Sequence, residues 1–437
     1  MSLKRVLVSG AAALALVGTA ATAAIHVEKD GTGDYLISPV YFANGNGWQT
    51  KIKVVNTNTT SAVIAKVIVR EGKSSKELVD FPLFLTPGDV FEATIAAGND
   101  GDIYIKSDDD SVIVKADGTP GLNVDLTALR ALLNTDCDTD EKKGYIEVIG
   151  LGDFNESTLK SWDPTWKVDC PYSKEILFRN VKGLTTADLN LTGAVDVADS
   201  DLMGQQIIYR NVSDDNGKRA MFLNMLAFGD TSNEAAMGTG VLGPDTGIDA
   251  IYGAPVLVEL KNELAKNHVY VMYEGNSDLK ADPFMTIFTY PYWKVGADAA
   301  DCDAYYTLSE TDVAFRDMNE TAAYCDHSCD DTQDGDYLSG PTPDNPECPE
   351  HNMTDEVQIV FLHDEGHPDA WANKYLFKSG GYIDINLPDD TTDYANDLTW
   401  KGLPIIPTTF YAKKVGDLYL NNHLYNQYRK DPKPEED

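Results

Sequence analysis

The chain has 437 residues, of which 43% are hydrophobic and 24% charged, so it is long enough for two or three globular domains and its composition is not that of a disordered protein. It carries 35 lysines and arginines against 70 aspartates and glutamates, a formal net charge of −35. This balance excludes nucleic acid and anionic lipid as partners, because basic surfaces bind both. It suits a salty environment or the binding of divalent cations.

Residues 1–24 have the pattern of a secretory signal peptide. Lys4 and Arg5 precede an apolar run, and Ala21 and Ala23 form a small-x-small cleavage site. No later run reaches the length of about 18 apolar residues that a spanning helix needs, so we expect no integral membrane segment in the mature chain. The sequence therefore predicts a secreted protein, extracellular or on the cell surface rather than periplasmic.

Residues 25–135 predict an immunoglobulin-like β-sandwich. Apolar or alternating runs, separated by turns rich in Asn, Gly, Ser and Thr, are typical of its short strands. These runs occupy residues 35–37, 51–55, 63–69 and 83–85. In the turn Thr86-Pro87-Gly88-Asp89, proline fixes one backbone angle and we expect glycine to take a positive φ. Leucines at helical spacing predict a short helix at 127–133 that closes the domain.

Residues 136–430 predict a second β-rich domain, followed by a polar tail at 431–437. One amphipathic helix is expected at 256–265. The predicted strands lie at 144–149, 206–209, 221–228, 268–272, 285–289, 357–362, 382–387 and 405–411. Between residues 296 and 351, 15 acidic residues accompany a single arginine and four cysteines. This composition predicts a long acidic insertion that is stapled by disulfides.

The six cysteines of this exported chain predict disulfides. We expect Cys137 to pair with Cys170. The other four lie close together in the acidic insertion and leave three pairings open. They are Cys302, Cys325, Cys329 and Cys348. His327 lies between Cys325 and Cys329, and His351 follows Cys348, which makes zinc an alternative, but an oxidising compartment favours disulfides.

Several segments together resemble a group of secreted, β-rich bacterial proteins that have no assigned function. They are residues 36–56, 69–81, 85–90 and 144–149, with the Leu-rich helix near Leu264. The resemblance is best over residues 35–95 and implies export, a sandwich-like N-terminal domain and a surface or extracellular address. It implies no catalytic residue. In fold alone, 54–57 followed by 85–88 is also similar to bacterial immunoglobulin-like adhesion modules.

Two sets of carboxylates predict calcium binding, because short acidic side chains in polar loops suit hard cations. One set has the spacing of a calcium loop, although Glu141 stands where such a loop needs glycine. It comprises Asp136, Asp138, Asp140 and Glu147. The other lies beside Cys329, whose bridge would limit the entropy lost on closing around an ion. It comprises Asp330, Asp331, Asp334 and Asp336. Aspartate is also favoured in turns for its local backbone hydrogen bonds.

Sequence patterns for catalysis are few. The run His363-Asp364-Glu365-Gly366-His367 is similar to a zinc-protease motif, but its glutamate comes one residue late and a predicted strand precedes it, so we interpret it as a polar loop. The sequence has no nucleophile elbow, phosphate loop or dinucleotide fingerprint, and we expect no organic cofactor. Paired carboxylates for glycoside hydrolysis are too numerous to single out.

These features predict a non-enzymatic structural or interaction protein of the cell surface or extracellular matrix, such as a subunit of a surface layer, fibre or appendage. We expect it to associate with itself or with other surface components and to be stabilised by Ca²⁺. A soluble carbohydrate- or protein-binding module is one alternative, marked by a concave face with exposed Trp or Tyr. A secreted hydrolase is the other, and it would need a cleft with two carboxylates or a metal.

Overall fold

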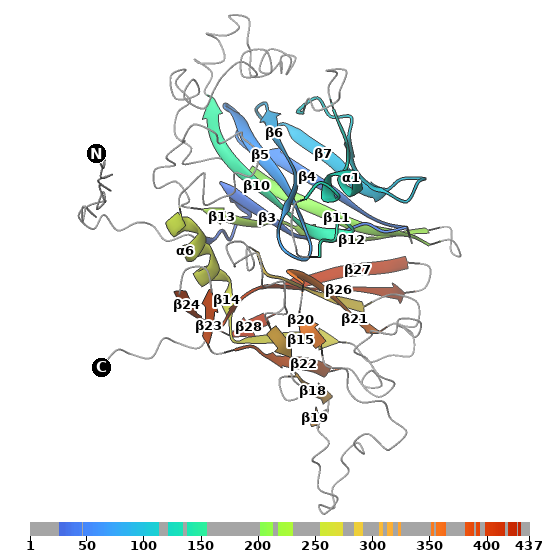
Figure 1. The fold of residues 1–437 in the computed structure, drawn as a ribbon, viewed down its shortest axis with the longest axis vertical. Coiled ribbons are helices and arrows are strands. Elements are labelled where there is room, and N and C mark those ends of the chain that lie inside the picture. Colours follow the sequence, from blue (N-terminus) through green and yellow to red (C-terminus); the bar gives the residue numbers. More distant parts are fainter. Residues whose placement is uncertain are drawn as a thin grey trace, which may run out of the picture.

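The structure is a computed structural model, and antiparallel β-sheets dominate it (Figure 1). The residues that it describes are 26–45, 47–112, 121–133, 138–154, 202–212, 217–229, 254–273, 284–291, 306–308, 313–317, 322–324, 351–353, 355–363, 381–388, 390–393, 398–415, 418–425 and 427–429. Two helices accompany the sheets in these ranges, α1 (Leu126–Arg130) and α6 (Ala254–Leu264). Neither is long and apolar enough to cross a membrane. The expectation of a mainly β protein with few short helices is confirmed.

Two antiparallel sheets form an N-terminal unit. The strands of sheet A, in spatial order, are β1 (His26–Val27), β13 (Leu226–Gly229), β3 (Tyr35–Phe42), β10 (Lys143–Phe154), β5 (Ala62–Glu71) and β6 (Glu77–Leu85). Those of sheet B are β12 (Gly217–Asn224), β11 (Leu202–Val212), β4 (Trp48–Asn56), β7 (Val90–Ala97), β8 (Ile103–Ser107) and β9 (Leu122–Asp125), with β2 (Thr32–Gly33) also paired to β11.

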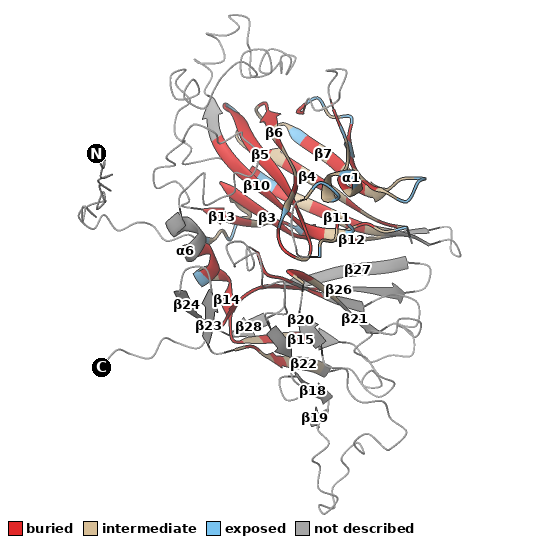
Figure 2. Ribbon diagram, in the orientation of Figure 1, coloured by how far each residue is buried: buried red, intermediate tan, exposed pale blue. Residues whose placement is uncertain are grey.

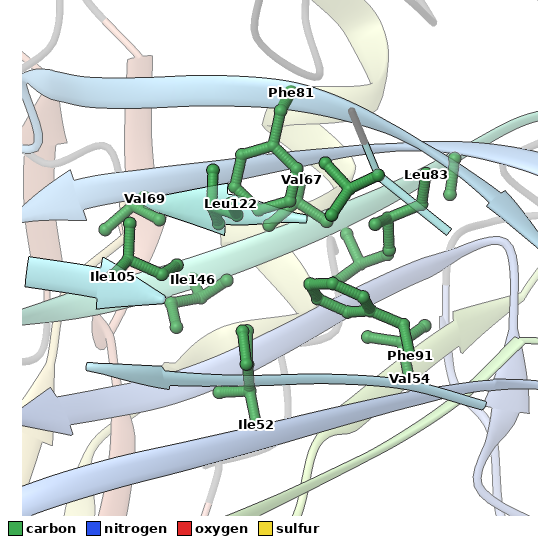
Figure 3. Packing of buried hydrophobic residues seen from close by; sticks show 14 of the residues in the cluster. Ile52, Val54, Val67, Val69, Phe81, Leu83, Phe91, Ile105, Leu122 and Ile146 are labelled. Carbon is green, nitrogen blue, oxygen red and sulfur yellow. The ribbon is translucent and has the colours of Figure 1, made fainter. Parts of the chain in front are cut away.

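One hydrophobic core lies between the two sheets. Val67 and Phe81 of sheet A face Val54 and Phe91 of sheet B, and all four are buried (Figure 3). The sequence of β4 alternates strictly between buried and half-buried residues, as expected for a strand with one face on a core. By contrast, every residue of β5 is buried, so this strand is covered on both faces.

The strand order places segments that are distant in the sequence next to each other in the sheets. β3 and β4 follow each other in the chain but lie in different sheets, and so do β10 and β11. β10 pairs with β3, and β11 pairs with β4, so the second pair of strands lies beside the first in both sheets. The strands therefore do not divide after residue 135, where the sequence predicted a boundary. Residues 143–154 and 202–229 complete the sheets that residues 26–125 begin.

Two glycines are required by the backbone of this unit. Gly88 lies in the predicted turn with φ +72°, a conformation that other residues seldom adopt. Gly144 lies in β10, where the chain passes so close to β5 that an added Cβ would be 1.9 Å from the carbonyl oxygen of Arg70. A side chain at position 144 would therefore push β10 and β5 apart.

Residues 254–429 form a C-terminal unit of smaller sheets. A five-stranded sheet has the order β19 (Ala322–Tyr324), β18 (Val313–Asp317), β22 (Gly381–Asn386), β15 (His268–Tyr273) and β28 (Gln427–Arg429). A four-stranded sheet has the order β21 (Val357–His363), β16 (Phe284–Thr289), β26 (Ile406–Val415) and β27 (Leu418–Tyr425). Three two-stranded pairs complete it: β14 (Ala265–Lys266) with β25 (Leu403–Pro404), β17 (Tyr306–Leu308) with β20 (His351–Met353), and β23 (Asp390–Asp393) with β24 (Leu398–Lys401).

Part of the segment expected to be an insertion belongs to these sheets. β18, at 313–317, pairs with β22 and so extends the five-stranded sheet, while β17 pairs with β20. The acidic segment 296–351 is therefore not wholly an insertion outside the sheets, because β18 within it pairs with β22. The disulfide staple expected there lies outside the described residues, as do all six cysteines.

The two units meet along a joint, a set of contacts between residues 39–143 and 289–357. Lys143 Nζ lies 2.5 Å from Asp355 Oδ2, and both side chains are largely buried. The backbone N–H of Val357 donates to the carbonyl of Gly72 at 2.8 Å, and the Thr289 hydroxyl donates to the carbonyl of Pro39. Figure 1 shows the units one above the other, with β12 beside β27. The joint places the C-terminal unit against β3 and β10 of sheet A.

Candidate functional site

The outward side of sheet B, here called the outer face, carries exposed apolar side chains, lysines and tyrosines. Its residues alternate along β4, β7 and β11 with the buried residues of the core. Lys51 and Lys53, for example, flank the buried Ile52. In Figure 2 these strands alternate mainly between the buried and intermediate colours, whereas β5 is buried throughout.

Apolar side chains gather at one end of the outer face. The structure describes four exposed large hydrophobic residues, and two of them, Val90 and Met203, lie here, at 44% and 40% exposure. A third, Phe222, at 48% exposure, is opposite Ile207 in the same cross-strand row as Lys51. Met203 is opposite Val55, and Val55 is opposite Val90, so one apolar row crosses three strands. A cluster of this kind on a sheet face is typical of an interaction surface, whereas single exposed apolar residues need no explanation.

Lysines occupy the middle of the outer face. Lys51 and Lys53 both contact the carboxylate of Glu92, the latter at 3.2 Å, so two positive charges share one negative charge. The hydrogen bond from Lys51, assisted by that from Lys53, lowers the pKa of Glu92. Lys106 lies on β8, with its Nζ 4.4 Å above the ring of Tyr104. The centre of the face is therefore positive in a chain whose formal net charge is −35.

Two tyrosines lie in one row across the outer face. Tyr209 is opposite Gln49, Gln49 is opposite Ala96, and Ala96 is opposite Tyr104. The Tyr209 hydroxyl donates to Gln49 Oε1 at 2.7 Å, and the Tyr104 hydroxyl donates to Asp100 Oδ2 at 2.8 Å. The bond to Asp100 raises the pKa of Tyr104 to about 12. Both rings are held in place by these bonds before any partner arrives.

The described residues of the predicted calcium loop at 136–147 form ion pairs and hydrogen bonds within the protein. Glu147 is fully buried in β10, where it pairs with Arg70 and accepts a hydrogen bond from Tyr35. Asp138 is exposed and 3.4 Å from Lys73, and Asp140 accepts from the backbone N–H of Lys142 at 2.9 Å. The described carboxylates of this loop do not converge, and no group of three or more metal-binding side chains occurs within the described ranges.

A different carboxylate organises this part of the chain. Glu71, which is fully buried, accepts backbone N–H groups from Lys73 at 2.8 Å and from Ser74 at 2.7 Å. It also accepts the N–H of Asp140 at 3.0 Å, and so joins the turn after β5 to the segment before β10. Glu71 therefore fixes the loop by side-chain-to-backbone bonds, where the sequence predicted a cation.

The remaining residues of the predicted site lie outside the described residues. They are Asp136, Asp330, Asp331, Asp334, Asp336, Cys137, Cys170, Cys302, Cys325, Cys329 and Cys348. Of the protease-like run, His363 ends β21, in agreement with the strand predicted before it, and the rest lies outside the described residues.

Sequence reasoning missed the outer face, although a signal was present. The alternation in β4 puts Gln49, Lys51 and Lys53 on one side, and the alternation in β11 does the same for Ile207 and Tyr209. What the sequence could not show is that β4 and β11 are neighbours, because about 145 residues separate them along the chain.

Comparison of the chain with protein-family models, with curated proteins and with solved structures finds no match.

Proposed function

We propose that this protein is an exported, non-enzymatic structural or interaction protein of the cell surface or extracellular matrix. The observation that carries the proposal is the outer face of sheet B, which combines an apolar row, a lysine centre and two fixed tyrosines. A surface of this composition favours contact with another macromolecule. A subunit of a surface layer, fibre or appendage needs such a face for association.

The proposal also includes a specific fold for the N-terminal unit. Two antiparallel sheets around one core support an immunoglobulin-like sandwich, related to bacterial surface modules, as the scaffold that presents the face. The signal-peptide pattern at 1–24 supports export. The aspartates at 330–336, beside Cys329, support stabilisation by Ca²⁺ and by disulfides.

A carbohydrate-binding module is the second candidate, favoured by the row that contains Tyr104 and Tyr209. Aromatic rings on a sheet face suit stacking against sugar rings, and Gln49 and Asn123 on the same face would supply hydrogen bonds. Both tyrosine hydroxyls already have protein partners, so the rings would act mainly by their apolar surfaces.

The test compares the wild-type protein with two triple variants in the native host. The face variant carries Lys51→Glu, Lys106→Glu and Phe222→Ser. The matched control carries Lys76→Glu, Lys142→Glu and Leu132→Ser, the same changes at exposed positions elsewhere. We expect the wild type and the control to remain with the washed cell surface and the face variant to appear in the medium. Equal retention of all three would contradict a role for this face, and a cytoplasmic location would contradict the proposal as a whole.

A further inference from the structure

We propose that the partner of the outer face is a second copy of this chain, which docks an acidic part of its surface there in a head-to-tail contact. This inference rests on the proposed function and names the partner of the same face. It follows from the charge of the chain, from the arrangement of charge and apolar groups on the face, and from the size of the face.

The charge argument begins with the contrast between the face and the whole chain. Lys51, Lys53 and Lys106 lie in the middle rows of the face with Glu92, whereas Asp100 and the half-buried Asp125 lie at its edge, beside Tyr104. The whole chain has 70 acidic residues against 35 basic ones. A second copy therefore offers mainly acidic surface, which is complementary to the lysine centre. Two lysine centres would repel each other, so the contact joins unlike surfaces.

The long-range repulsion between two such acidic chains does not prevent this contact. At about 0.15 M salt the Debye length is about 8 Å, so charges far apart on the two copies scarcely interact. Lysine–carboxylate pairs in contact are much closer than this and keep their attraction. The salt of an extracellular environment therefore removes the repulsion and leaves the local complementarity.

The apolar row supplies the burial that a stable contact needs. Val90 and Met203 in this row, and Phe222 in the row of Lys51, keep 40% or more of their surface exposed, so a partner that covers them gains hydrophobic free energy in proportion to the apolar area buried. Six strands spaced by about 4.8 Å, and about 20 Å along β4, give the face a projected area of about 500 Å². This is the order of size of one side of a specific interface, about 800 Å² of accessible surface.

A head-to-tail contact has a consequence that a two-fold contact lacks. Each copy offers both a face and an acidic counter-surface, so association continues beyond two subunits unless a ring closes. A copy with a disabled face still offers its acidic surface. It can therefore occupy the face of a wild-type copy without offering one of its own, and it ends growth at that point.

The experiment is sedimentation velocity of the full exported chain at physiological salt, for the wild type, the face variant and the matched control. We expect large species for the wild type and the control, and monomer for the face variant, whose association constant falls by at least about tenfold. Mixing equal amounts of the face variant and the wild type should shorten the wild-type assemblies. Circular dichroism and a thermal melt of each variant show that the folds are intact.

The outcomes separate this inference from the proposed function. A discrete wild-type dimer, or wild-type assemblies that the face variant leaves unchanged in length, would overturn the head-to-tail contact. Wild-type protein that stays monomeric, while cells still retain it through the face, would overturn the second copy as partner and leave the proposed function standing. Monomeric protein that cells do not retain would overturn both.

Discussion

The two sheets of the N-terminal unit share one core, but their outward sides differ in how far they are buried. On β5 and the neighbouring part of β10 in sheet A the outward side is buried, and sheet A contains the ion pairs Lys66–Asp80, with Nζ and Oδ2 2.6 Å apart, and Arg70–Glu147. On sheet B the outward side is half exposed, and Lys51 and Lys53 share Glu92 in contact with water. The same kind of ion pair is thus part of the interior on one sheet and part of a surface on the other.

This difference decides which ion pairs hold the fold together. A buried charge that loses its partner is left in a medium that solvates it poorly, and the cost is several kcal/mol. An exposed charge that loses its partner is solvated by water, and the cost is about 0–1 kcal/mol. Removing one partner of a pair on sheet A is therefore costly, whereas the lysines on sheet B can serve binding at little cost in stability.

The largest predicted effect is that of Glu147→Gln. The substitution leaves Arg70, which is 6% exposed, without its carboxylate, and we expect the free energy of unfolding to fall by about 3–5 kcal/mol in urea denaturation. Glu92→Gln is the matched change on the exposed sheet and should cost less than about 1 kcal/mol.

A double variant sharpens the same comparison. Arg70→Met with Glu147→Leu removes both charges and should recover much of the loss, because a well-packed apolar pair can replace a buried ion pair. Equal effects of Glu147→Gln and Glu92→Gln would show that the two sheets do not differ in the way the burial indicates.

Much of the strand content could be predicted from local patterns. The alternation in β4, the apolar run of β5 and the turn at Gly88 all appear in the structure where the sequence places them. The predicted strand at 221–228 is instead two strands in different sheets, β12 and β13, with Met225 between them. Periodicity alone could not show this division, because it depends on which sheet each half joins.

The site was harder to predict than the strands, and Glu147 shows why. Its spacing from Asp136 and Asp138 fits a calcium loop, but spacing does not tell whether a strand residue faces water or the interior. In the structure its neighbours across the strand pairs are Ile37 and Ile68, and its side chain reaches Arg70. These partners lie about 80–110 residues away in the sequence, so only the sheet order reveals them.

A smaller effect is expected at the joint between the units. Asp355→Asn removes the charge that Lys143 meets at 2.5 Å, where both side chains are 14–15% exposed. We expect a loss of about 1.5–3 kcal/mol, the range for a hydrogen bond to a charged group. The loss should appear as a lower unfolding midpoint and as faster proteolysis between the units, with Asp138→Asn, in an exposed pair, as the matched control. If Asp355→Asn lowered the free energy of unfolding as much as Glu147→Gln, the ion pair at the joint would matter as much for stability as the buried pair on sheet A.

The smallest effect concerns the pH dependence of the lysine centre. Because Lys51 and Lys53 lower the pKa of Glu92 in the folded state, this group stabilises the protein above its unfolded pKa. That contribution is lost as the pH falls through the lower pKa of the folded state. Lys51→Ala should therefore raise the pKa of Glu92 toward its ordinary value of 4.5, measured by carboxyl NMR titration. Lys106→Ala, which leaves both contacts of Glu92 in place, is the control and should move this pKa much less. An unchanged pKa in Lys51→Ala would show that the lysine and the carboxylate are separated by water, and would remove the fixed charge pattern on which docking at this face depends.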